Sequence, residues 1–85
     1  MLLKVFTKED GLDTNNAINL SKELEPEEFQ VEYLDLDAPE SYQQAEIYRI
    51  FCSPSFVVTD GEGREINSWR GVIPSLDEIK NYLRQ

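Results

Sequence analysis

Histidine is absent from the 85 residues, and cysteine occurs once, as Cys52. The lack of histidine removes the commonest general base and metal ligand at neutral pH. A single thiol cannot form an intramolecular disulfide, a paired-cysteine zinc site or a dithiol redox couple. We therefore expect no metal site and no cofactor.

Basic residues are also scarce. The chain has 8 Lys and Arg and 17 Asp and Glu, which gives a net charge of −9. Binding to a nucleic-acid backbone or an anionic membrane surface requires a cationic face. No stretch approaches the roughly 18 consecutive apolar residues of a membrane-spanning helix, and Lys4 interrupts the first apolar run. We expect neither nucleic acid nor membrane as a partner, and a cytoplasmic location that keeps the lone thiol reduced.

The chain length is that of one small domain, which we predict over residues 1–85 as a monomer. Residues 2–6 form a nearly continuous apolar run that is typical of a buried strand. Small and apolar residues then recur at helical spacing over residues 14–24, ahead of the helix-breaking Pro26. Residues 29–36 alternate between apolar and polar and predict a second strand, parallel to the first.

The second half predicts a helix, a hairpin and a last helix. Asp37 is the expected N-cap of the first of these helices, which should run toward Phe51. Strand-forming residues 55–59 and 64–69 flank a glycine-rich turn typical of a hairpin. Ser75 and Glu78 form a capping box for the last helix. The expected apolar face of the helix after Asp37 consists of Tyr42, Ala45, Ile47 and Tyr48.

Several stretches of the second half form a recognisable pattern. They are Ser53-Pro54-Ser55-Phe56-Val57-Val58, Asp60-Gly-Glu-Gly-Arg64, Trp69-Arg-Gly71 and Ser75-Leu-Asp-Glu-Ile79. This pattern resembles the thioredoxin and glutaredoxin superfamily, and the element order extends the resemblance over essentially the whole chain. The resemblance implies a thioredoxin-like α/β fold, βαβ-α-ββα, with a four-stranded mixed sheet flanked by three helices. It also implies a cis peptide bond between Ser53 and Pro54.

The chain departs from that superfamily where the first strand meets the first helix. Redox-active members carry CxxC, or at least one nucleophilic cysteine, at this position, where free helix amides stabilise the thiolate. Here residues 10–15 read Asp-Gly-Leu-Asp-Thr-Asn. Dithiol exchange needs two thiols in one chain. The resemblance therefore implies the fold but not the dithiol activity.

Cys52 is the only candidate catalytic residue, and its role has two interpretations. The first is a small apolar filler that enters the third strand, because free cysteines are often buried. The second is a monothiol that forms mixed disulfides with a protein or with glutathione, activated by nearby Arg49. The absence of histidine and the excess of negative charge disfavour a thiolate.

Ser53 and Pro54 give a binding hypothesis that needs no thiol. In the superfamily, the backbone beside this proline pairs with an extended segment of a client protein. We therefore predict that Ser53, Pro54 and Ser55 bind a protein or an extended peptide. Phe51 and Leu12 would add an apolar patch beside them. The alternative is that Pro54 only shapes the loop before the third strand.

Thr14 and Asn15 lie at the predicted start of the first helix. Residues of these types are common helix caps, which is one interpretation of both positions. The other is that they receive an anion or a substrate carboxylate together with the free helix amides. The carboxylate of Asp13 would repel such a ligand.

Three functions remain open on this sequence. The leading one is a redox-inactive binding module that uses the Ser53-Pro54 segment. The second is a monothiol oxidoreductase that uses Cys52. The third is an acidic mimic that binds a basic protein surface, which the charge alone supports.

Overall fold

A computed structural model describes residues 1–8, 11, 13–24 and 30–83. These residues contain four strands and three α-helices in the order that the sequence predicts. None of the helices among them is long and apolar enough to cross a membrane. The elements are β1 (Leu2–Thr7), α1 (Thr14–Leu24), β2 (Gln30–Asp35), a 3-10 turn (Pro39–Ser41), α2 (Tyr42–Tyr48), β3 (Ser55–Thr59), β4 (Glu65–Arg70) and α3 (Leu76–Leu83).

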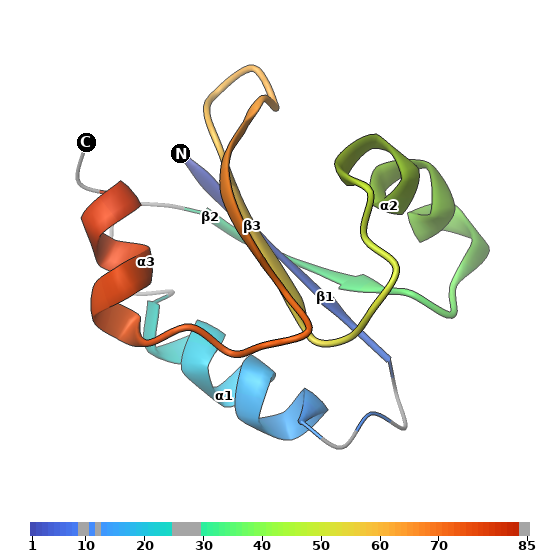
Figure 1. The fold of residues 1–85 in the computed structure, drawn as a ribbon, viewed down its shortest axis with the longest axis horizontal. Coiled ribbons are helices and arrows are strands. Elements are labelled where there is room, and N and C mark those ends of the chain that lie inside the picture. Colours follow the sequence, from blue (N-terminus) through green and yellow to red (C-terminus); the bar gives the residue numbers. More distant parts are fainter. Residues whose placement is uncertain (9–10, 12, 25–29, 84–85) are drawn as a thin grey trace.

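The strands form one mixed sheet in the order β2-β1-β3-β4. Strand β1 runs parallel to β2 and antiparallel to β3, and β3 pairs antiparallel with β4. Strand β1, which the sequence predicts to be buried, therefore lies inside the sheet between β2 and β3. Helices α1 and α3 cover one face of the sheet and α2 covers the other (Figure 1).

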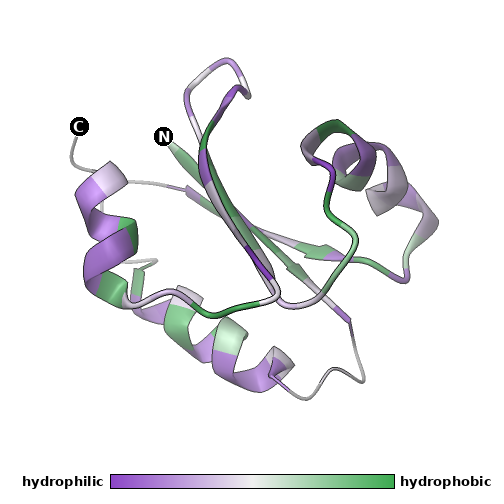
Figure 2. Cartoon of the chain, viewed as in Figure 1, coloured by the Kyte–Doolittle hydropathy of each residue, from purple (hydrophilic) through white to green (hydrophobic). Residues whose placement is uncertain are grey.

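Each face of the sheet has its own apolar layer, because successive side chains of a strand point to opposite faces. Alternate residues of β1 and β3 meet α1 and α3 on one face. The intervening residues meet α2 on the other. Figure 2 shows the same division, with apolar strands between helices whose outer sides are polar. The first layer contains Leu3, Val5, Ala17, Leu24, Phe56, Val58 and Ile79, and the second contains Phe6, Ala45, Tyr48, Ile50 and Val57.

Helix α1 has the apolar periodicity that its sequence predicts. Ala17, Ser21 and Leu24 are fully buried. The hydroxyl of Ser21 is satisfied inside the layer, because it donates to the carbonyl of Ala17 at 2.8 Å. The predicted stop at Pro26 lies outside the described residues.

The predicted limits of the second helix are wrong at both ends. The chain first makes a 3-10 turn whose N-cap is Ala38, so Asp37 is not the cap, and α2 starts only at Tyr42. The helix ends at Tyr48 because Arg49 adopts a left-handed conformation with φ 55°. Side-chain N–H groups of Arg70 donate to the carbonyls of Tyr48 and Arg49, at 2.6 and 3.3 Å. This early end leaves residues 50–54 as a loop.

The predicted apolar face of α2 is only half correct. Ala45 and Tyr48 are buried, but Tyr42 is 55% exposed and Ile47 is 69% exposed. The two-turn helix meets the sheet through Ala45 and Tyr48 together with Ile50. Tyr42 and Ile47 therefore remain at the surface.

The two core layers predict a contrast between two identical substitutions. Ile79→Val removes a methylene from a fully buried side chain of α3, whereas Ile47→Val does so on the exposed side of α2. We expect Ile79→Val to lower the free energy of unfolding by about 0.5–1.5 kcal/mol, because it leaves a cavity. Ile47→Val should change it by less than about 0.5 kcal/mol. Urea unfolding followed by circular dichroism measures both, and equal losses would contradict the described packing.

Candidate functional site

The end of β1 meets the start of β3 because the two strands are antiparallel. Phe6 is opposite Ser55 in the ladder, and continuing this register past the strands brings Lys8 opposite Ser53. The amide of Lys8 donates to the hydroxyl of Ser53 at 3.1 Å. The peptide bond between Ser53 and Pro54 is cis. We call the three residues before Pro54 the corner; they are Phe51, Cys52 and Ser53.

Ser55 supports the corner from inside. Its side chain is fully buried, and its hydroxyl donates to the carbonyl of Cys52 at 2.7 Å. The amide of Gly71 donates to the carbonyl of Pro54 at 2.9 Å and to the Ser55 hydroxyl at 3.3 Å. Gly71 has φ 76°, a conformation that favours glycine. Ser55, predicted to contact a ligand, instead holds the loop that would do so.

The corner itself is open to solvent. Phe51 is 81% exposed, Cys52 is exposed and Ser53 is half-buried, while Pro54 is buried. Figure 2 shows this connection between α2 and β3 as a hydrophobic segment. Among the described residues, the backbone amide and carbonyl of Ser53 have no hydrogen-bond partner. The corner therefore presents an exposed apolar ring and, close by in the chain, backbone groups that pair with no described residue.

The interpretation of Cys52 as a buried filler of the third strand is wrong. Because α2 ends at Tyr48, Cys52 falls in the loop and not in β3. Its thiol is exposed, and Sγ lies 3.7 Å from the hydroxyl oxygen of Ser55.

Within the described residues, hydrogen bonds connect the start of α1 to the corner through Lys8, and Gly11 also lies close to the Ser53 hydroxyl. Thr14 is buried, and its hydroxyl donates to the carbonyl of Lys8, which also accepts from the amide of Gly11 at 3.0 Å. Thr14 therefore fixes the loop after β1. Asn15 is exposed, and no hydrogen bond joins it to the corner within the part of the chain that the structure describes. Leu12 lies outside that part.

A groove of about 290 Å³ adjoins the corner, between α2 and the chain that follows β1 and β2. Phe51 forms one wall, and Lys8 and Glu46 are charged groups of its lining. The other lining residues are Leu36, Tyr42, Ala45 and Ile50. No sequence pattern identified Lys8, Leu36, Tyr42 or Glu46 as site residues. The order of the strands was the available signal, because it brings the ends of β1 and β2 to the same edge as the loop before β3.

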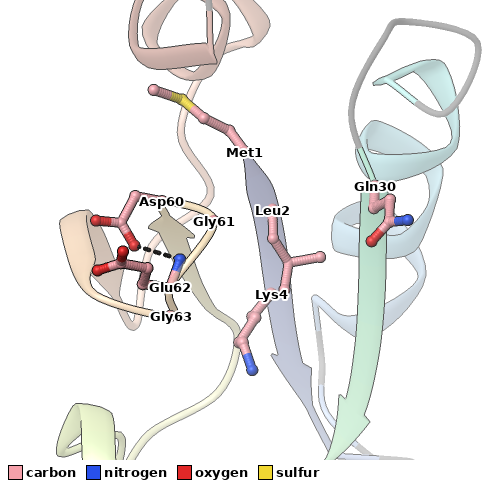
Figure 3. Close-up of a pocket in the computed structure, with 8 residues that line it drawn as sticks. All are labelled: Met1, Leu2, Lys4, Gln30, Asp60, Gly61, Glu62 and Gly63. Atoms are coloured by element: carbon pink, nitrogen blue, oxygen red, sulfur yellow. Dashed lines mark hydrogen bonds between the residues drawn. The ribbon is translucent and has the colours of Figure 1, made fainter.

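A second hollow, of about 460 Å³, lies at the opposite end of the sheet, beside the β3–β4 turn (Figure 3). Its charged side chains are already partnered. Lys4 contacts Glu32 at 3.7 Å, bonds to Gln44 and lies over the ring of Tyr48. The backbone amides of Arg64 and Glu62 donate to Asp60 and hold the pKa of its carboxyl below the usual range. We therefore do not assign a site there.

The phenol of Tyr48 joins α2 to the same turn, because its hydroxyl donates to the carbonyl of Gly63 at 2.5 Å. Burial, and then the carboxylates of Glu32 and Glu65, raise the pKa of this phenol above its ordinary value. The ring is therefore an uncharged donor at neutral pH.

Within the described residues, no group of three or more Cys, Asp or Glu side chains could hold a metal ion.

The chain is thus a small α/β protein in which the loop before the third strand is exposed to solvent. Two solved structures are similar to it over nearly its whole length. One is a thioredoxin from Thermus thermophilus, at 24% identity and TM-score 0.67, covering 99% of this chain and 71% of that one. Another is a designed protein, also at 24% identity and TM-score 0.67, covering 98% and 72%. The chain therefore has a thioredoxin-like fold, as its sequence predicts. No protein-family model and no curated protein matches it.

The buried hydroxyl of Ser55 provides a test of the corner's support. Ser55→Ala leaves the carbonyl of Cys52 without its donor, and we expect it to lower the free energy of unfolding by about 1–2 kcal/mol. Cys52 should also react faster with iodoacetamide, because the loop that carries it is less restrained. Ser68→Ala on β4 is the matched control, because Ser68 is less deeply buried. Unchanged stability and labelling in Ser55→Ala would contradict this role.

Proposed function

We propose that this thioredoxin-like domain is a cytoplasmic binding module that holds an extended segment of a protein partner at the corner. The observation that carries the proposal is that the backbone amide and carbonyl of Ser53 form no hydrogen bond with any described residue, two positions after the exposed ring of Phe51. Main-chain hydrogen bonds provide affinity for an extended segment, and adjacent side-chain contacts provide specificity. The corner has both components.

The fixed conformation of the corner supports this proposal. Lys8 bonds to Ser53 from one side, while Ser55 bonds to the carbonyl of Cys52 from the other. A loop held in place before binding loses less conformational freedom when a partner docks. The corner is therefore suited to a segment that becomes ordered on binding.

The proposed activity does not use dithiol chemistry. The 85 residues contain one cysteine, and the segment between β1 and α1 contains none. Exchange within one chain would need a second thiol. In the proposed binding module Cys52 is therefore an exposed neighbour of Ser53 and not half of a dithiol pair.

Binding can be tested with linear peptides selected from a random phage-displayed library against the wild-type domain. We expect Cys52→Ala to keep the affinity of the selected peptides within about twofold. Ser53→Tyr should lower it at least about tenfold, which corresponds to roughly 1.4 kcal/mol, because the new side chain covers the backbone groups. Fluorescence polarisation measures both. Methylation of the peptide amide that pairs with Ser53 should cause a similar loss.

Ser68→Tyr is the control for the added ring, since Ser68 lies in β4 and not at the corner. Failure to select any peptide, or equal losses for Ser53→Tyr and Ser68→Tyr, would overturn the proposal. Binding that survives Ser53→Tyr but falls about tenfold in moderate salt would indicate a charge-driven surface instead, because salt screens exposed charges beyond about 8 Å.

A monothiol function is the second candidate, and the exposure of Cys52 favours it. In this reaction the Cys52 thiol loses its proton to solvent, and the thiolate attacks one sulfur of oxidised glutathione. The glutathione disulfide breaks, a mixed disulfide forms on Cys52, and the released glutathione thiolate takes up a proton. Attack requires a thiolate, so its rate follows the pKa of the thiol.

The pH dependence of Cys52 labelling separates the two candidates. If the domain is a binding module only, we expect iodoacetamide to label Cys52, at every pH, no faster than it labels a short peptide containing cysteine. Labelling that is already much faster than that of the peptide below neutral pH, with rapid formation of a glutathione adduct that Cys52→Ala abolishes, would instead support the monothiol function.

A further inference from the structure

Two charged groups of the groove beside the corner form no ion pair with any described residue. Within residues 1–8, 11, 13–24 and 30–83, neither the carboxylate of Glu46 nor the ammonium of Lys8 forms an ion pair. Both residues line the groove. In contrast, Lys4, Arg64 and Arg70 are all paired with acids. The groove therefore retains charged groups that a ligand can contact.

Two large apolar side chains that line the groove are unusually exposed. Phe51 is 81% exposed and Tyr42 is 55% exposed, and both are lining residues. Leu36, Ala45 and Ile50 complete the lining between them. An exposed apolar surface with a polar rim is typical of a protein-recognition site. Its volume of about 290 Å³ is at the lower end for ligand pockets.

Charge around the groove is mostly negative. Asp37 and Glu40 are exposed in the chain segment that connects the lining residues Leu36 and Tyr42, and Glu46 follows on α2. The opposing cations are Lys8 and the exposed Arg49. The whole chain carries −9, so long-range attraction also favours a cationic segment.

From this geometry we infer the chemistry of the partner: an extended segment with an apolar side chain that enters the groove and an adjacent Lys or Arg that pairs with Glu46. The inference rests on the proposed binding at the corner, because the backbone of the segment would pair with Ser53 while its side chain enters the groove. Phe51 belongs to both the corner and the groove. One extended segment can therefore contact both.

The test uses peptides selected from the same random library, now compared by sequence. We expect the selected peptides to share an aromatic or large aliphatic residue next to Lys or Arg. Phe51→Ser should weaken them at least about tenfold, as expected for an aromatic anchor in a contact surface. Glu46→Lys should weaken them about fivefold, the upper range for one exposed ion pair.

A peptide in which the basic residue is replaced by Glu provides the reciprocal measurement. It should bind wild type weakly and regain affinity for Glu46→Lys, which isolates the pairwise interaction. Glu23→Lys is the matched control, because it makes the same charge change on the exposed side of α1, across the sheet. It should leave the affinity of all peptides within about twofold and restore none.

The outcomes distinguish this inference from the proposed function. Peptides that depend on Ser53 but share no apolar-basic pattern, or that ignore Glu46→Lys, would overturn the inference and leave the proposed function standing. No selected peptides at all would overturn both. If sedimentation shows a dimer that Phe51→Ser converts to monomer, the groove is occupied by a second copy and the inferred partner is wrong.

Discussion

The antiparallel pairing of β1 with β3 is the constraint on which the corner depends. It brings the loop after β1 beside the loop before β3, so that Lys8 can donate to Ser53. The same strands separate the two apolar layers, since their alternate side chains face α1 and α3 or α2. A change in this register by one residue would move the buried side chains to the wrong face and separate the two loops. Fold and site therefore rest on one set of backbone hydrogen bonds.

The early end of α2 is the second decisive feature. Arg49 adopts a left-handed conformation. The side chain of Arg70, on β4, donates to the carbonyls of Tyr48 and Arg49 at the end of α2. The chain from Ile50 onward is consequently a loop, with Ile50 buried in the α2 layer and Phe51 turned to solvent. Ile50 thus anchors the loop to the core, and Phe51 is exposed and can contact a partner. This division explains how so small a domain can expose a large aromatic ring without losing its core.

Much of the fold followed from local patterns. The apolar run of β1, the helical spacing in α1 and the glycine-rich turn before β4 each predicted its element, because short-range periodicity reflects which side faces the core. The site was harder to predict. Cys52 and Ser55 are separated by two residues, yet one is exposed and the other fully buried. No local pattern distinguishes them, because both lie against Gly71, which is distant in sequence. Tyr42 and Ile47, predicted on the apolar face of α2, lie at the surface for a related reason, since the short helix does not bring them onto the sheet.

The sequence by itself determined the α/β element order, the acidic character of the protein and the lack of a second thiol, because these depend on composition and on local spacing. Only the tertiary structure decided that Cys52 is exposed, that Ser55 is a buried support and that Lys8 and Glu46 line one groove. The reason is physical. Exposure and proximity depend on which distant segments pack together, and those contacts are set by the strand order and by the point at which α2 ends.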